Sequence, residues 1–233
     1  TIRYESAGAL SGGRIIWLLA RMPGREYFVD QQDRIEPYIL FSNAHDGTRS
    51  VQIQPTSVRV VCRNTWTMAL SRKHTQRLWI RHTGDLKGKI ATARGILGMI
   101  DQQLEALKEI GRRLVEVRPD MGEVEIYFQT LYPDPQDGGS REETRRRLMQ
   151  VFLSPDSTST DRTAWGAMQA VTRFVDHDAT MPAARTRMNV PTAAARRFER
   201  AMIGSGRDVK VRALRAAVAQ WVPDFTDVVG VAD

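Results

Sequence analysis

Residues 42–48, SNAHDGT, bring together side chains that can do acid–base or metal chemistry. An imidazole beside a carboxylate, as in His45 and Asp46, can act as a general base, and His82 could supply a second one. However, Asp-Gly after a polar residue and between two apolar runs is a strong signal for a β-hairpin turn. We therefore predict a structural turn at Asn43, His45, Asp46 and Gly47. The alternative is a metal-dependent nuclease or another phosphate-transfer enzyme that uses Asn43, His45, Asp46 and His82.

Other patterns for catalysis or metal binding are weak. The four histidines, at positions 45, 74, 82 and 177, include no pair with the i, i+4 spacing of metal ligands on a helix. The single cysteine, Cys62, excludes a multi-cysteine zinc site. A two-metal nuclease needs several carboxylates together, and residues 49–90 contain only Asp85. We therefore predict a protein that is not an enzyme and uses no cofactor or metal.

Basic residues are concentrated in residues 49–90, which hold nine Lys and Arg and one acid. Trp66 and Trp79 lie among them. A cationic groove combined with aromatic faces is how proteins bind single-stranded nucleic acid. The alternative is a solvated basic surface with both tryptophans in the core. The nucleic-acid-binding residues that we predict are Arg49, Arg59, Arg63, Arg72, Lys73, Arg77, Trp79, Arg81, Lys87 and Lys89.

The overall charge of +7 has the same origin. Residues 1–90 hold 14 Lys and Arg against 7 acids, whereas residues 91–233 hold 20 of each. Such a local excess favours a polyanionic partner. No apolar run is long enough to span a membrane, and with one cysteine and no leader pattern the expected location is cytoplasmic. The opening TIRYESAGAL reads as a strand already under way, so we expect a fragment that lacks an N-terminal segment.

The hydrophobic pattern predicts an α+β fold with a break near residue 84. Residues 1–84 form an antiparallel β-rich nucleic-acid-binding core, with a hairpin at Ser11-Gly12-Gly13 and an interruption at Pro55. CRNTWTMAL, residues 62–70, reads as a short helix that completes a β-β-β-α core, and QRLWIRHT, residues 76–83, as a further strand. Residues 85–233 form a helical region for packing or oligomerisation.

Three-four spacing of apolar residues marks the helices of this second region. A long amphipathic helix of about eight turns is expected from residue 86 onward, with Gly111 interrupting its apolar side. That side carries Ile90, Ala93, Leu97, Ile100, Leu104, Leu107 and Leu114. Ser140 and Glu143 predict a capping box for the helix that follows them. Another helix carries Trp165, Met168, Val171 and Val175 on one face, and Asp176 and His177 are expected to make polar contacts at its end. Two closing helices flank the Gly-Ser-Gly at 204–206.

Several blocks of sequence resemble the phage/plasmid-like protein family, a domain of unknown function that travels on mobile elements. They include YESAGALSGGRIIWLLAR, EPYILFSNAHDGTRSV, PTSVRVVCRNTW, WIRHTGD, TAWGAMQAVTRFVDH and RRFERAMIGSG. The blocks occur in order along nearly the whole chain. Family members are longer at the N-terminus, which agrees with the expected missing segment.

The order of the hairpin, strands and following helix also resembles the core of single-strand annealing proteins of the Rad-fifty-two, RecT and Red-beta type. That resemblance implies annealing of single-stranded DNA in homologous recombination, in homo-oligomeric rings or filaments, without a nucleotide cofactor. Arg59 and Arg63 would then contact phosphates, with Arg49 at the rim of the groove. RNA is an alternative strand. A third hypothesis is an oligomeric structural or anti-defence protein that uses the long helix as its partner surface.

Overall fold

The structure is a computed structural model of the 233-residue chain. It describes residues 2–31, 33–45, 51–59, 64–67, 78–80, 101–102, 104–154, 162–178, 193–202 and 204–230. For residues 11, 58, 59, 64–67, 78–80 and 193–195 it describes only the backbone.

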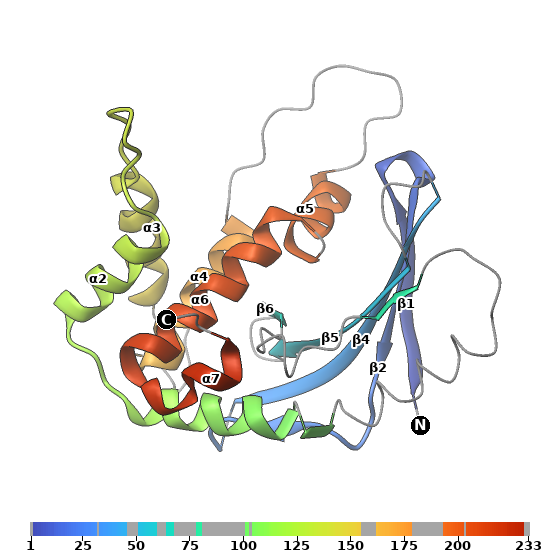
Figure 1. The fold of residues 1–233 in the computed structure, drawn as a ribbon, viewed down its shortest axis with the longest axis horizontal. Helices are drawn as coiled ribbons and strands as arrows, with labels where there is room; N and C mark the ends of the chain where they lie inside the picture. Colours follow the sequence, from blue (N-terminus) through green and yellow to red (C-terminus); the bar gives the residue numbers. More distant parts are fainter. Residues whose placement is uncertain are drawn as a thin grey trace.

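A curved antiparallel sheet forms one side of the molecule, and most of the helices lie on the other side (Figure 1). The strands along its main path pair in the order β1-β2-β4-β5-β6, while β3 pairs with β4 and β7 pairs with β5. This arrangement confirms the predicted antiparallel platform. The strands are β1 (Arg3–Leu10), β2 (Ile15–Arg21), β3 (Tyr27–Phe28), β4 (Arg34–Ala44), β5 (Val51–Arg59), β6 (Asn64–Thr67) and β7 (Leu78–Ile80).

The predicted first hairpin is present. A single 3-10 turn, η1 (Ser11–Gly13), joins β1 to β2, and the two strands pair from Leu10 and Ile15 outward. Gly12 and Gly13 have φ angles of 69° and 90°, a conformation that side chains with a Cβ atom rarely adopt. The two glycines therefore allow the tight reversal.

Pro55 does not interrupt its strand, contrary to the sequence-based expectation. β5 is continuous and pairs with β4 along its length, with Pro55 opposite Ile39. On the other edge of β5, β7 pairs with residues 51–53 and β6 with residues 56–59. Pro55 lies between the parts of β5 that pair with these two short strands. No backbone N–H is required there for pairing with β6 or β7, which explains why proline is tolerated.

The predicted helix over residues 62–70 is wrong where the structure describes this segment. Residues 64–67 form β6, which pairs antiparallel with β5, Thr67 opposite Thr56 and Asn64 opposite Arg59. The free edge of β5 can pair with this short segment, and this pairing overrides the helical preference expected from its sequence. The helix of the predicted β-β-β-α core is therefore not found at residues 64–67, whereas the α+β class is confirmed.

Helices make up the second part of the chain, as predicted. Residues 101–102 and 104–116 are helical, and the rest of the predicted long helix lies outside the described residues. The helices that follow are α2 (Met121–Leu131), α3 (Glu142–Phe152), α4 (Ala164–Arg173), the π-helical turn η2 (Phe174–Asp178), α5 (Ala193–Met202), α6 (Ser205–Trp221), the 3-10 turn η3 (Pro223–Phe225) and α7 (Thr226–Val229). None of the described helices is both long enough and apolar enough to cross a membrane.

A capping box occurs at a different helix from the predicted one. The Asp120 side chain accepts a hydrogen bond from the N–H of Glu123, and the Glu123 carboxylate accepts one from the N–H of Asp120, so this pair starts α2. At α3, the hydroxyl of Ser140 accepts only from the N–H of Glu142. The carboxylate of Glu143 instead pairs with Arg146, so it does not complete a box.

One hydrophobic core includes residues from both the sheet and the helices. It joins Ile35, Ile39 and Ile53 of the sheet to Trp165 of α4 and Leu214 of α6. The predicted apolar faces are confirmed in the described helices, because Leu104, Leu107, Leu114, Trp165, Met168, Val171 and Val175 are all buried. The sheet and the described helices therefore share one core.

Gly111 is a packing position in this core. A Cβ atom there would lie 3.0 Å from both γ-carbons of Val29 and 3.4 Å from the ring of Trp165. At the residue that interrupts the apolar spacing, the helix therefore lies close to Val29, just after β3, and to Trp165 of α4. This close approach explains why a glycine stands on the apolar side of the helix.

Both faces of the central strand are covered. Ile39 and Leu40 are consecutive in β4 and therefore point to opposite faces, yet both are 0% exposed. Near the β1–β2 hairpin a second apolar cluster joins Leu10, Ile15 and Ala44 with Trp17 and Phe198. The rings of Trp17 and Phe198 stack with centroids 4.1 Å apart, which fastens α5 to the sheet.

Candidate nucleic-acid interface

The structure places few of the predicted nucleic-acid-binding residues. Arg59 is the last residue of β5, opposite Ile35 of β4 and Asn64 of β6, and Trp79 of β7 lies opposite Gln52. Only backbone positions are described for Arg59 and Trp79. The other predicted residues lie outside the described part of the chain: Arg49, Arg63, Arg72, Lys73, Arg77, Arg81, Lys87 and Lys89.

The register separates the two described positions. Positions 35 and 42 of β4 belong to opposite faces of the sheet, because the side-chain period of a strand is two. Position 59 pairs with position 35, and position 79 pairs through Gln52 with position 42. Positions 59 and 79 therefore belong to opposite faces. β5 and β6 pair antiparallel, with Arg59 opposite Asn64, and the rest of the predicted extended segment from Arg59 to Arg63 lies outside the described residues.

The predicted turn begins where β4 ends. Asn43 lies in β4 opposite Ile16, and the N–H of His45 donates to the carbonyl of Arg14 over 2.8 Å. Asp46 and Gly47 lie outside the described residues, as does His82. The flanking strands β4 and β5 pair antiparallel, Ser42 opposite Gln52, which is the arrangement that a hairpin connection requires. The described residues contain no group of three His, Cys, Asp or Glu that could hold a metal ion.

Arginines in the described part of the sheet make ion pairs. Arg21 lies 3.3 Å and Arg34 3.1 Å from the same carboxylate oxygen of Glu36, while Arg25 lies 2.8 Å from Asp101. These pairs neutralise much of the positive charge beside β2, β3 and β4.

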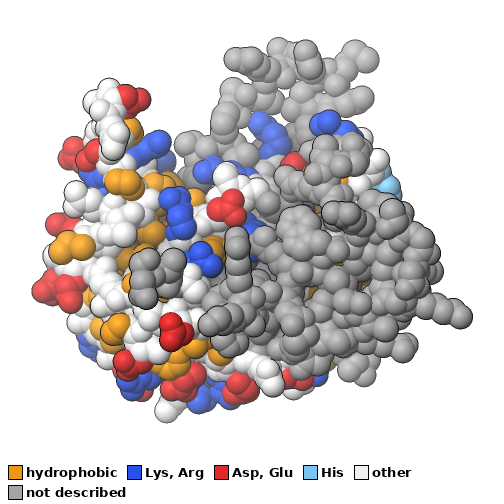
Figure 2. All heavy atoms as spheres, viewed as in Figure 1, with side chains coloured by type: hydrophobic (Ala, Val, Ile, Leu, Met, Phe, Trp, Pro, Cys, Tyr) orange, Lys and Arg blue, Asp and Glu red, His pale blue; other side chains and the backbone are white. Residues whose placement is uncertain are grey.

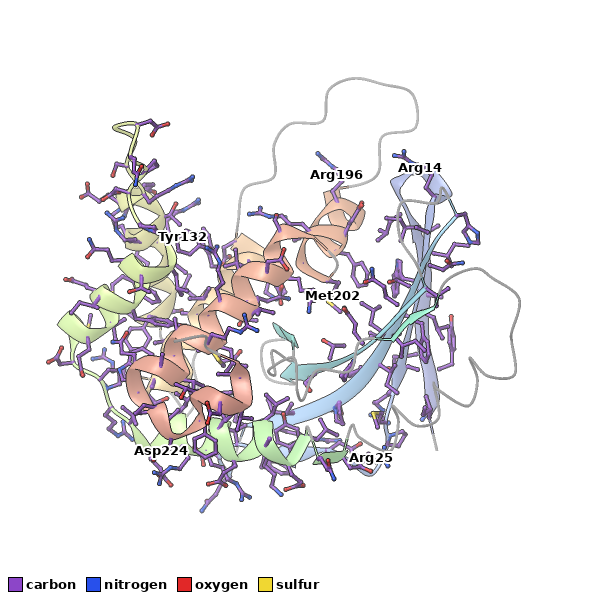
Figure 3. The ribbon with its side chains drawn as sticks, in the orientation of Figure 1. Arg14, Arg25, Tyr132, Arg196, Met202 and Asp224 are labelled. Carbon is purple, nitrogen blue, oxygen red and sulfur yellow. The ribbon has the colours of Figure 1, made fainter. Side chains whose placement is uncertain are left out.

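A second basic element, α5, was not predicted from the sequence. It carries Arg196, Arg197 and Arg200 against a single acid, Glu199. The Trp17–Phe198 stack fixes it beside the β1–β2 hairpin, and Figure 3 shows Arg196 and the hairpin residue Arg14 at the same end of the molecule.

A local charge count would have found this region. α5 and α6 together contain seven Lys and Arg and two acids. Averaging over residues 91–233 conceals this excess, because acids elsewhere balance it.

An ion pair is buried beside α5. Asp176 of η2 and Lys210 of α6 are joined by a 2.8 Å hydrogen bond, which confirms that Asp176 makes a polar contact at the end of its helix. Burial lowers the pKa of Lys210, and the carboxylate of Asp176 opposes this shift. Because both side chains are buried, this pair holds η2 against α6.

Comparison with known families identifies the chain at the level of its family. The family model for domain of unknown function DUF932 matches residues 1–202. The chain belongs to this family. No curated protein and no solved structure matches the sequence significantly. The DUF932 match includes the whole sheet and ends at Met202, the last residue of α5.

Proposed function

We propose that this DUF932 protein binds single-stranded nucleic acid through the basic segment 49–90. The observation that carries the proposal is the charge of this segment, nine Lys and Arg against one acid. Parts of it are strands β5, β6 and β7 of the sheet, and Arg59 is the last residue of β5. Contacts to phosphates need no base readout, so the protein binds with little sequence preference.

Two further features favour a single strand as the ligand. Trp66 stands in β6 opposite Ser57, on the same face of the sheet as position 59, and aromatic side chains on a sheet are common platforms for unstacked bases. Arg196, Arg197 and Arg200 of α5 would add cations beside the β1–β2 hairpin. We infer that the strand is DNA and that the protein promotes annealing during recombination of phages or plasmids, as a homo-oligomer and without a nucleotide cofactor.

Fluorescence anisotropy with a labelled 40-nucleotide single strand tests the proposal. We expect binding at low salt whose logarithmic dependence on salt weakens by about 1.4 when Arg59 and Arg63 are both changed to Gln, since each phosphate contact contributes about 0.7. Arg112→Gln with Arg113→Gln is the charge-matched control on the helix of residues 104–116, and it should leave the slope unchanged. Absence of binding by the wild type would refute the proposal.

The same reagents address annealing and the enzymatic alternative. Two complementary labelled strands should pair faster with the protein than without it, and electron microscopy should show rings or filaments on the DNA. Incubation with magnesium or manganese should leave the strands intact. Cleavage that disappears in a His45→Ala variant would instead identify a nuclease.

A further inference from the structure

We propose that a hollow between α3 and η2 binds a phosphate group. The hollow has a volume of about 260 Å³. Such a volume is just below the range of drug-sized ligand pockets, about 300–1,000 Å³, and suits a phosphate or a single nucleotide. The described lining consists of Arg147, Gln150, Val151, Ser154, Arg173, Phe174 and Asp178.

Two arginines from different elements reach this hollow. Arg147 comes from α3 and Arg173 from the last turn of α4. Guanidinium groups have planar, paired donors that match phosphate oxygens. The amide of Gln150 and the hydroxyl of Ser154 add neutral donors at the same place.

The ion pair between Arg147 and Glu143 is long. Arg147 Nε lies 3.9 Å from a carboxylate oxygen of Glu143. By contrast, Arg146 Nε lies 2.8 Å from Glu143, which it engages through two hydrogen bonds. The carboxylate of Glu143 is therefore held by Arg146, and a phosphate could approach Arg147 without breaking a short ion pair.

More positive charge lies on the other side of Phe174. The ring of Phe174 meets Tyr132 edge-on, with centroids 6.4 Å apart. Burial raises the pKa of Tyr132, and the positive charges of Arg200, Arg212 and Arg141 oppose this rise, so three further arginines act on this phenol. Figure 2 shows Lys and Arg side chains gathered on the viewed face around α3 and toward α5. Cations grouped around a concave site concentrate the field that attracts an anion.

Two features act against an anion in the hollow. Asp178 is part of the lining, and α3 and α4 end beside it, where the helix dipoles are negative. Part of the positive charge of Arg147 and Arg173 is needed to offset the negative charge of Asp178 and of the two helix ends. Binding therefore requires both guanidinium groups, and loss of one should have a large effect.

Neighbouring arginines on α3 provide a matched test. Titration of the full chain with inorganic phosphate, followed by phosphorus NMR or calorimetry at low salt, should give saturable binding that Arg147→Gln weakens about tenfold, as expected for loss of a charge-assisted hydrogen bond. Arg146→Gln removes the same charge one residue away and should change affinity less than about twofold. Gln150→Glu keeps both arginines, changes an exposed residue and should also weaken binding about tenfold.

Parallel titrations with a mononucleotide and a 40-nucleotide single strand identify the source of the phosphate. If Arg147→Gln weakens all three ligands, the hollow holds part of a nucleic-acid backbone. If it weakens only the two small ligands, the hollow holds a small phosphate compound. Either result supports the site and does not depend on the proposed DNA binding. The proposal is overturned if the wild type shows no saturable phosphate binding, or if Arg146→Gln and Arg147→Gln weaken it equally.

Discussion

The ammonium nitrogen of Lys210 lies 2.8 Å from a carboxylate oxygen of Asp176, and the two side chains are 0% and 6% exposed. The residues are 34 positions apart and join the π-helical turn η2 to α6. Buried pairs of this kind contribute little net stability as a pair, but loss of one partner leaves the other charge in an apolar environment.

Lys210→Met should therefore lower the free energy of unfolding by about 3–5 kcal/mol. The double change Lys210→Met with Asp176→Leu should recover at least about 2 kcal/mol of that loss, because no lone charge stays buried. Urea unfolding measures all variants. Lys108→Met is the control, since its ion pair with Glu105 lies on the surface and should contribute less than about 1 kcal/mol. If the double variant is no more stable than the single one, the lone buried charge of Asp176 is not the cause of the loss.

Stability should fall as the pH rises above 10, because buried tyrosines keep their protons in the folded protein. Burial raises the pKa of Tyr127 well above 10, and a nearby glutamate adds to burial in raising that of Tyr38 to about 12. The unfolded chain loses these protons near pH 10, so it binds fewer protons than the native state above that pH. Each such tyrosine then lowers the free energy of unfolding by up to about 1.4 kcal/mol per pH unit.

Comparison with Tyr127→Phe isolates one of these tyrosines. Its hydroxyl donates to the carbonyl of Ala213 over 2.9 Å, so the variant should lose about 1 kcal/mol at pH 8. Between pH 10 and 11 its stability should decrease less steeply than that of the wild type, by about 1 kcal/mol per pH unit. Equal slopes for the two proteins would show that Tyr127 ionises normally in the folded state.

Trp165→Phe should destabilise the junction between α4 and the sheet. The indole N–H of Trp165 donates to the carboxylate of Asp33 over 2.8 Å, and Asp33 is fully buried. Loss of a hydrogen bond to a charged, buried acceptor should lower the free energy of unfolding by about 1.5–3 kcal/mol. Thr130→Ala removes an exposed hydrogen bond to the carbonyl of Ile126 and should change it by less than about 0.5 kcal/mol. A similar effect of both changes in urea unfolding would contradict this role of Asp33.

Gly206→Ala should also be destabilising, although alanine is normally the better helix former. The added Cβ would lie 2.8 Å from Cγ1 of Val175 and 2.9 Å from the carbonyl oxygen of Arg200. Relief of this clash requires a backbone shift, with an expected cost of about 1–3 kcal/mol. Gly139→Ala is the matched control, because its nearest neighbour would be a side-chain carbon at 3.4 Å. Thermal melts of the two variants should therefore differ by several degrees.

The spacing of apolar residues in the sequence predicted which faces of the helices are buried. Trp165, Met168, Val171 and Val175 recur at helical spacing, and the structure buries all four. The pairing of residues 64–67 with β5 was missed, because it depends on an edge formed by another segment. Likewise, Ser140 and Glu143 have the spacing of a capping box, but Arg146 competes for the carboxylate of Glu143.

The candidate sites also combine features that are visible in the local sequence with features that depend on contacts between distant segments. The charge of residues 49–90 is visible in the sequence, but the register that puts positions 59 and 79 on opposite faces requires the pairing of β4, β5 and β7. The hollow beside Arg147 and Arg173 could not be predicted, because it forms only where α3 packs against α4 and η2. Lys210 has no local sign of being buried, and its partner lies on another element.

The position of α6 affects how the protein can be divided for experiments. The DUF932 match stops at Met202, whereas Leu214, Val218 and Trp221 of α6 belong to the core shared with the sheet. A protein shortened to the family boundary would expose Tyr127, whose ring lies 4.8 Å from that of Trp221, and would favour aggregation. Residues 205–221 are thus part of the smallest unit that can fold, and deletion mapping of binding activity should retain them.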